Sequence, residues 1–142
     1  MSYAARPRPH IGETLELPFS TARVPAGFPS PAEDYLEASL DIAGYLVKRP
    51  RATFFMRVVG DSMIGDGIHD GDLLVIDRAE TVKDGRIVVA RLDGEFTVKR
   101  FRFIDGRPWL YSANERYEPI EITEDTDFEI WGCVTFAITS LK

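Results

Sequence analysis

Asp-Gly pairs that separate short apolar runs constrain this chain more than any other feature. From Thr53 onward the runs contain many β-branched and aromatic residues, which are typical of strands. Aspartate and glycine tolerate the left-handed backbone that tight turns require, so each pair predicts a reversal of the chain. We therefore expect a mainly β fold of short, twisted, antiparallel strands. The pairs lie at 66–67, 70–71, 84–85, 93–94 and 105–106.

Three of these runs also predict the order of neighbouring strands. The segments 86–92, 95–104 and 107–112 are separated only by the pairs at 93–94 and 105–106. Turns of this length join antiparallel neighbours in a sheet. The region therefore predicts a three-strand meander.

One or two short helices are expected before these strands. Ser30 is a suitable N-cap, Pro31 suits the first helical position, and Glu33 completes a capping box. A second helix can start at Asp41 and must stop before Pro50. Helical spacing is kept by the apolar residues Leu36, Leu40, Ala43 and Leu46.

The first 26 residues differ in character from the rest of the chain. They contain four of the nine prolines and little apolar periodicity, so we expect an extended arm there. The segment 24–31, VPAGFPSP, is a loop by composition. Residues 27–142 are enough for one hydrophobic core, since single domains are typically about 100–150 residues long. The predicted organisation is an arm at 1–26 and a β-rich domain at 27–142.

The composition excludes several classes of function. A formal net charge of −6 is repelled by nucleic acid phosphates, so direct sequence-specific DNA binding is not expected. One cysteine, Cys133, and two histidines, His10 and His69, are too few for a disulfide or a metal centre rich in these ligands. We expect no metal and no cofactor. No apolar run approaches the roughly 18 residues of a membrane span, and residues 1–20 lack a secretory signal, which indicates a soluble cytoplasmic protein.

The stretch VVGDSMIGDGIHDGD, at 58–72, places Ser62 in a glycine-rich turn. A serine hydroxyl is a poor nucleophile until a neighbouring base accepts its proton. His69 is a weak candidate for that base, because it stands in the same loop and a rigid serine–histidine pair is usually assembled from separate elements. A solvated loop residue is the better interpretation of His69.

Lys99 is the alternative base. Strand alternation in 95–103 places Lys99 and Thr97 on one face, and apolar residues on both faces predict that the strand is covered on both sides. Burial would desolvate the Lys99 amine and lower its pKa from about 10.4, and a shift to pH 7 requires roughly 4.6 kcal/mol. Thr97 is a candidate to orient the amine by a hydrogen bond. Spacing alone leaves open whether Ser62 and Lys99 meet.

Four motifs occur together in this chain: GDSM at 60–63, the DGI and DGD that follow it, EFTVKR at 95–100, and Ala26-Gly27. In this combination the chain resembles the LexA-type self-cleaving Ser-Lys peptidases, and within them the UmuD-like group. The resemblance covers nearly everything from residue 24 to the C-terminus. It implies that Ser62 is the nucleophile, Lys99 the general base and Ala26–Gly27 the bond that is cut. Two small residues at that bond let the backbone enter a narrow site.

The resemblance also implies a mechanism and partners. With Lys99 neutral, Ser62 attacks the carbonyl carbon of Ala26, and we expect backbone N–H groups of Ser62 and Met63 to hold the oxyanion. Members of the UmuD-like group cleave themselves with a RecA filament on single-stranded DNA as co-protease. Their shortened homodimer joins a UmuC-type translesion polymerase in the SOS response to DNA damage. LexA-like repressors carry a helix-turn-helix domain, which the 26 residues before the bond do not resemble, so the UmuD-like interpretation is favoured.

The C-terminal strand is a second indication of a dimer. The even positions between 128 and 138 form one apolar face, while Trp131, Cys133 and Ala137 leave the other face apolar as well. One face suits the core and the other suits a second copy. A strand buried on both faces within one chain is an equal alternative. Cys133 is expected to be packed, because no evident feature lowers its thiol pKa. The even-numbered residues are Phe128, Ile130, Val134, Phe136 and Ile138.

Two other function classes fit parts of the sequence. A Ser-Lys signal peptidase would need a membrane anchor, which these residues do not suggest. A non-catalytic β-rich interaction module, or polymerase accessory subunit, would use the Ser62 turn only as a turn. A strand lysine ordinarily keeps its ammonium in water, which fits that alternative. Cleavage at Ala26–Gly27 that disappears in Ser62→Ala distinguishes the peptidase from the module.

Overall fold

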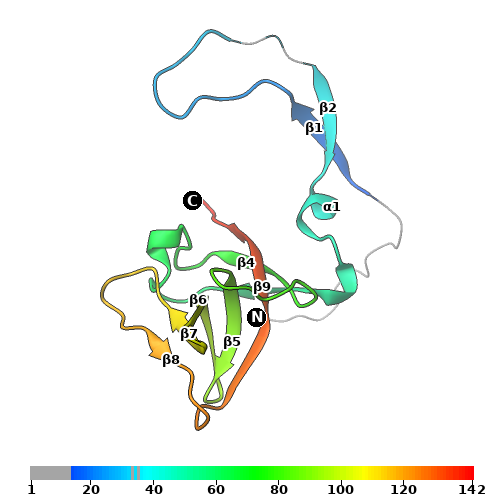
Figure 1. Ribbon diagram of the computed structural model, residues 1–142. Helices are drawn as coiled ribbons and strands as arrows, with labels where there is room; N and C mark the ends of the chain where they lie inside the picture. The colour runs from blue at the N-terminus through cyan, green and yellow to red at the C-terminus, as the bar shows by residue number, and fades with distance from the viewer. Residues whose placement is uncertain (1–13, 33, 35) are drawn as a thin grey trace. The chain divides into compact units, whose positions relative to one another are not determined.

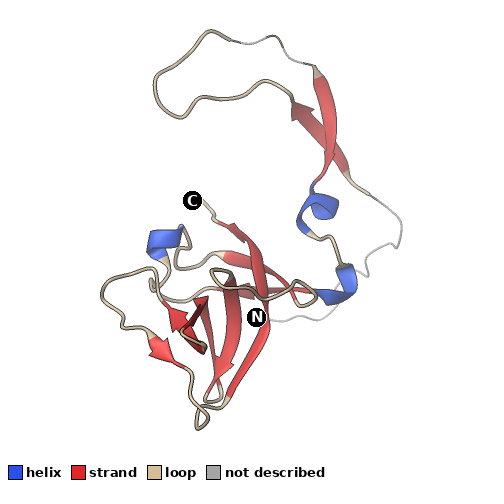
Figure 2. Cartoon of the chain, viewed as in Figure 1, coloured by secondary structure: helices blue, strands red, loops and turns tan. Residues whose placement is uncertain are grey.

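A computed structural model describes residues 14–32, 34 and 36–142 of this protein. The chain divides into two compact units, one up to Tyr45 and one from Leu46 onward. Regular structure is mainly strand in both units (Figure 2), so the expected mainly β fold is confirmed. Residues 1–13 of the predicted arm and Glu33 of the predicted capping box lie outside the described residues.

The first unit contains a two-stranded antiparallel sheet. Strand β1 (Glu16–Ser20) pairs with β2 (Glu37–Asp41), in a register that places Glu16 opposite Asp41 and Ser20 opposite Glu37. Two further hydrogen bonds join the residues directly after β1 and directly before β2. Thr21 N–H donates to the Leu36 carbonyl at 3.2 Å, and Leu36 N–H donates to Thr21 Oγ1 at 2.9 Å. The described part of the arm is thus extended at 16–20.

The helix predicted to start at Ser30 is wrong, because none of the described residues from Ser30 to Leu36 is helical. Leu36 precedes β2 and Leu40 lies within it, because pairing with β1 supplies the backbone hydrogen bonds that a short isolated helix would hold only marginally. The second predicted start is confirmed by α1 (Ile42–Leu46), where Asp41 Oδ1 accepts the N–H of Gly44 at 3.0 Å. Within the described residues, no helix has the length and hydropathy of a membrane span.

The second unit is built on one antiparallel sheet with the strand order β3-β4-β9-β5-β6-β7-β8 (Figure 1). The consecutive neighbours β5, β6 and β7 confirm the predicted meander. Its turns use left-handed backbone at Asp93, with φ 49°, and at Asp105, with φ 51°. The strands are β3 (Thr53–Arg57), β4 (Leu73–Asp77), β5 (Ile87–Leu92), β6 (Glu95–Ile104), β7 (Arg107–Tyr111), β8 (Ile120–Glu121) and β9 (Phe128–Ile138), and two 3-10 turns are η1 (Pro50–Ala52) and η2 (Ile64–Asp66).

The long strand β9 pairs with β5 through its first half and with β4 through its second half (Figure 1). The register shifts once in each half, so that Trp131 and Thr135 are extra residues with no direct partner. Each such bulge reverses which face the following residues occupy. Cys133 therefore packs with Phe128 and Ile130 in one cluster, whereas Trp131 packs in the other. The prediction of a single apolar face on even-numbered residues is wrong for this reason.

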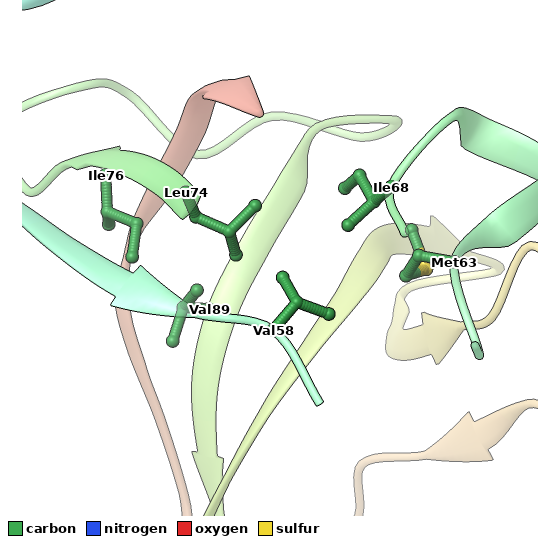
Figure 3. Close-up of a cluster of buried hydrophobic side chains, with 6 residues drawn as sticks. All are labelled: Val58, Met63, Ile68, Leu74, Ile76 and Val89. Carbon is green, nitrogen blue, oxygen red and sulfur yellow. The ribbon is translucent and has the colours of Figure 1, made fainter. Parts of the chain in front are cut away.

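Two clusters of buried apolar side chains hold the second unit together. The first brings the loop between β3 and β4 against the strands, since Met63 and Ile68 of that loop point toward Leu74 of β4 (Figure 3). Met63 is only 1% exposed, and burying a side chain of this size contributes about 1.5–3 kcal/mol. The loop that carries Ser62 is therefore anchored to the core by the next residue. The first cluster comprises Val58, Met63, Ile68, Leu74, Ile76 and Val89, and the second comprises Val88, Ala90, Leu110 and Cys133.

Candidate functional site

Ser62 lies in the loop between β3 and β4, directly before the buried Met63. The chain enters the loop through Gly60, whose φ of 100° is costly for residues with a side chain. Gly60 N–H donates to Asp70 Oδ1 at 2.8 Å, which ties the start of the loop to its end. The turn η2 follows Ser62 and closes with Gly67 in a left-handed conformation. The glycine-rich turn predicted here is thus a closed loop that presents a half-buried serine.

Lys99 reaches Ser62 from the middle of β6, in the register position opposite Val88 of β5. Its Nζ donates to Ser62 Oγ at 2.9 Å and lies 3.3 Å from the carbonyl oxygen of Val98. Lys99 is only 8% exposed, so its expected burial is confirmed. The structure therefore brings together the two residues whose meeting the sequence left open.

The environment of the Lys99 amine favours its neutral form. Burial lowers the pKa of the Lys99 amine below its ordinary value, because an ammonium loses hydration in the protein interior. Within the described part of the chain, no carboxylate forms a salt bridge with Lys99. Its two hydrogen-bond partners, a hydroxyl and a carbonyl, are uncharged. An amine in this setting can accept the proton of Ser62 when the hydroxyl attacks an electrophile.

Thr97 lies near this pair but does not orient it in the way the sequence suggested. The hydrogen bonds of the Lys99 amine go to Ser62 and to Val98, and none among the described residues goes to Thr97. Thr97 instead lines a pocket of ≈ 210 Å³ beside Ser62. The other lining residues are Met56, Arg57, Val58, Val59, Leu74, Val89, Phe96 and Val98.

His69 is engaged elsewhere, in agreement with its interpretation as a loop residue. Its side chain is half exposed, and its Nδ1 lies 3.6 Å from Oδ2 of the buried Asp72. The same carboxylate oxygen accepts the His69 backbone N–H at 2.8 Å. No hydrogen bond joins His69 to Ser62 in the region that the structure describes.

A second loop, at 112–117 after β7, holds the Ser62 loop and was not singled out in the sequence. Ala113 N–H donates to the Ser62 carbonyl at 2.8 Å, and Asn114 Nδ2 donates to the Asp61 carbonyl at 3.0 Å. Gly65 N–H donates to the Ala113 carbonyl at 2.7 Å. The approach at Gly65 is so close that a Cβ there would lie 2.6 Å from the same oxygen. The sequence indicates a turn at Asn114, because asparagine favours turns. It does not indicate the contact between Asn114 and the Ser62 loop, since Asn114 and Asp61 are 53 residues apart in the chain.

The backbone N–H groups of Ser62 and Met63 donate to no partner among the described residues. Two neighbouring free N–H groups beside a nucleophile are what an oxyanion hole requires. Cys133 plays no such part, because it is fully buried and burial raises the pKa of its thiol. Its predicted packed role is confirmed.

The Ala26–Gly27 bond lies in the exposed loop between β1 and β2. The flanking apolar side chains are almost fully exposed, Val24 to 91% and Phe28 to 95%. A Cβ placed on Gly27 would have no neighbour within 4 Å. This segment is therefore unobstructed within its own unit.

Comparison with known proteins identifies the family. The Peptidase S24-like family description matches residues 18–135. Protein SamA of Salmonella typhimurium strain LT2 is 49% identical over 118 residues, which are 83% of this chain and 81% of SamA. Protein MucA and Protein ImpA of Salmonella typhimurium are each 46% identical, MucA over 86% of this chain and 84% of its own length, ImpA over 92% and 88%. These relatives are UmuD-type proteins, so the resemblance inferred from the motifs is confirmed. The chain belongs to the Peptidase S24-like family.

Proposed function

We propose that this chain is a self-cleaving serine peptidase in which Lys99 activates Ser62 to cut the chain's own Ala26–Gly27 bond. The observation that carries the proposal is the 2.9 Å hydrogen bond between Lys99 Nζ and Ser62 Oγ. It is supported by the burial of an amine whose two hydrogen-bond partners are uncharged, since such an amine is a better base near neutral pH. Membership of a peptidase family supports the same chemistry.

The reaction proceeds in two stages. Ser62 Oγ attacks the carbonyl carbon of Ala26 while Lys99 Nζ takes its proton, and the N–H groups of Ser62 and Met63 bind the oxyanion. The carbon–nitrogen bond breaks, and the ammonium of Lys99 returns the proton to the departing amine of Gly27. Water, deprotonated by Lys99, then releases the acyl group from Ser62. The products are residues 1–26 and 27–142.

Cleavage changes the connectivity of the first unit. The strands β1 and β2 lie on opposite sides of the cut bond, and all five residues of β1 are exposed. A two-stranded sheet is marginally stable at best, and loss of the covalent connection raises the entropic cost of pairing. Residues 1–26 are therefore released, and 27–142 remain as the processed form. The reaction works as a switch, because each chain is its own substrate and turns over once.

The proposed physiological role is based on that of UmuD-type proteins, to which the relatives of this chain belong. In this proposal a RecA filament on single-stranded DNA stimulates the cleavage during the SOS response. The shortened chain forms a homodimer and joins a UmuC-type translesion polymerase, with no direct sequence-specific DNA contact of its own. The net charge of −6 is consistent with action through protein partners. In this proposal the chain acts in the cytoplasm.

Intact mass spectrometry tests the peptidase directly. The purified protein is incubated at about pH 10, where a lysine with a lowered pKa is largely neutral, beside the variants Ser62→Ala and Lys99→Ala. We expect a fragment that begins at Gly27 from the wild type alone. If all three stay whole at this pH, the incubation is repeated with RecA, single-stranded DNA and nucleotide. Failure of the folded wild type there as well refutes the peptidase and leaves the β-rich interaction module.

A further inference from the structure

We propose that Asn114 is a positioning residue that, with the backbone N–H of Ala113, aims the two N–H groups of the oxyanion hole. The inference rests on the proposed function, in which the N–H groups of Ser62 and Met63 stabilise the transition state. It adds a residue far from the motif that identifies Ser62. The contacts that carry it are made to carbonyl oxygens and not to side chains of the loop.

Two hydrogen bonds from the 112–117 loop fall on peptide units that also contain these N–H groups. The peptide unit between Asp61 and Ser62 contributes the Ser62 N–H and the Asp61 carbonyl. This carbonyl accepts from Asn114 Nδ2 at 3.0 Å and, within its own loop, from Ile64 N–H at 3.2 Å. The next unit contributes the Ser62 carbonyl, which accepts from Ala113 N–H at 2.8 Å, and the Met63 N–H. Two consecutive peptide planes are therefore held by two consecutive residues of the other loop.

Because the peptide bond is planar, these two contacts also fix the direction of the Ser62 and Met63 N–H groups. In a planar trans peptide the C=O and N–H bonds point in opposite directions. With both carbonyls directed toward Ala113 and Asn114, both N–H groups point away from that loop. Neither N–H has a partner among the described residues. Donors oriented before the reaction stabilise an oxyanion without any cost of reorganisation in the transition state.

Asn114 is itself held through its side chain and through its backbone. Its Oδ1 accepts the N–H of Arg116 at 3.0 Å, and its backbone carbonyl accepts the N–H of Tyr117 at 3.1 Å. Since Oδ1 is occupied by a donor, Nδ2 must be the atom that faces the Asp61 carbonyl. Asn114 is therefore a rigid link between a turn and a peptide plane.

The variant Asn114→Asp separates these two roles. Aspartate keeps an acceptor for the Arg116 N–H but presents an oxygen, and no donor, to the Asp61 carbonyl. We expect self-cleavage about 10–100-fold slower, because loss of a whole oxyanion donor costs about 10²–10³-fold and misorientation costs less. In the neutral variant Asn114→Ser the midpoint of the pH–rate profile stays at the wild-type value, because the hydrogen bonds of Lys99 are untouched and no charge is added. The neutral variant Asn114→Ser also loses the donor contact and excludes charge as the cause.

Labelling of Ser62 by a small probe is a second test, because it does not require the Ala26–Gly27 segment to enter the site. A fluorophosphonate probe forms a bond between phosphorus and Ser62 Oγ, fluoride leaves, and Lys99 takes the serine proton. The phosphoryl oxygen develops negative charge where the acyl oxyanion would lie, so labelling also depends on the aim of the two N–H groups. We expect the labelling rate of intact Asn114→Asp, followed by mass, to fall by a factor similar to that of cleavage.

Tyr117→Phe is the matched control. The Tyr117 hydroxyl comes from the same loop and donates to the same residue, but to the carboxylate Oδ1 of Asp61 at 2.8 Å and not to its peptide unit. We expect both rates to stay within about threefold of the wild type, as for an exposed hydrogen bond. Thermal unfolding of every variant establishes that it is folded, and if Asn114→Asp is not, Asn114→Ser is judged by the same criteria.

The outcomes separate this inference from the proposed function. If the wild type neither cleaves, even with RecA, nor takes the label, the peptidase itself fails. If the wild type reacts but folded Asn114 variants react at its rate, the positioning role alone is refuted. Equal losses in Asn114→Asp and Tyr117→Phe, or a shifted pH midpoint in Asn114→Ser, refute it too, because either result means general disturbance of the loop or of Lys99.

Discussion

The burial of Lys99 predicts an unusual dependence of stability on pH. Lys99 is 8% exposed, and its amine has only uncharged hydrogen-bond partners among the described residues. The pKa of the amine is lowered in the folded protein, whereas in the unfolded chain it is about 10.4. Between these two values the unfolded chain binds the additional proton, so the free energy of unfolding rises with pH. Below the folded pKa both states are protonated, and the cost of burying the ammonium is then present in full.

The substitution Lys99→Met isolates this effect. Methionine is unbranched and apolar, so it fills similar space without an ionisable group. Both proteins carry Ser62→Ala, which prevents cleavage during the measurement. The free energy of unfolding of the protein that retains Lys99, minus that of the Lys99→Met variant, should rise with a slope approaching about 1.4 kcal/mol per pH unit. The rise begins at the lowered pKa of the folded protein and ends near the unfolded value of about 10.4.

Denaturant unfolding at several pH values between about 7 and 10.4 measures the difference. Other titrating groups cancel, because both proteins contain them. A difference that stays constant over this range would mean that Lys99 keeps an ordinary pKa in the folded state. That result would refute the argument that burial makes Lys99 a base.

Two glycine substitutions test close approaches in the second unit. In Gly65→Ala the new Cβ would lie 2.6 Å from the Ala113 carbonyl oxygen, so we expect a loss of about 1–3 kcal/mol in the free energy of unfolding. If Ser62 shifts by ~1 Å, the cleavage rate should fall about 10²-fold. Ile64→Ala, at the exposed neighbouring residue, is the control, and an unchanged cleavage rate in Gly65→Ala would contradict the prediction. In Gly132→Ala the new Cβ would lie 2.7 Å from Cγ2 of the buried Ile76. Denaturant unfolding should show a loss of about 1–3 kcal/mol in the free energy of unfolding. A stability equal to that of the wild type would show that β9 can move away from β4.

The elements that sequence reasoning identified are those with strong local signals. The Asp-Gly pairs at 93–94 and 105–106 place the turns of the meander, because their left-handed backbone needs no help from distant residues. Asp41 similarly starts α1 through a hydrogen bond three residues along the chain. The spacing of Leu36 and Leu40 predicts a helix, but pairing of β2 with β1 places Leu40 in a strand and Leu36 directly before it. The bulges at Trp131 and Thr135 likewise could not be predicted from the sequence, because a bulge is defined by the register with the neighbouring strands β5 and β4.

The residues of the candidate site likewise divide into those that the sequence could identify and those that it could not. Ser62 and Lys99 could be selected because few side chains can serve as nucleophile and base, and because their motifs resemble a known family. Asn114 could not, because its contact is to a backbone carbonyl of Asp61, and every residue offers such an oxygen. Strand alternation predicts a hydrogen bond between Thr97 and the Lys99 amine, yet the amine donates to the Val98 carbonyl instead.

By itself the sequence determined the chemical groups, the positions of the tight turns and the mainly β character of the chain, because these depend on side-chain chemistry and on the backbone preferences of single residues. Only the tertiary structure decided that Lys99 loses its water and comes within 2.9 Å of Ser62. The physical reason is that desolvation and hydrogen bonding depend on what surrounds an atom in space. For Lys99 those surroundings come from β5, β6 and the Ser62 loop, which are distant in sequence and are brought together by the packing of the sheet.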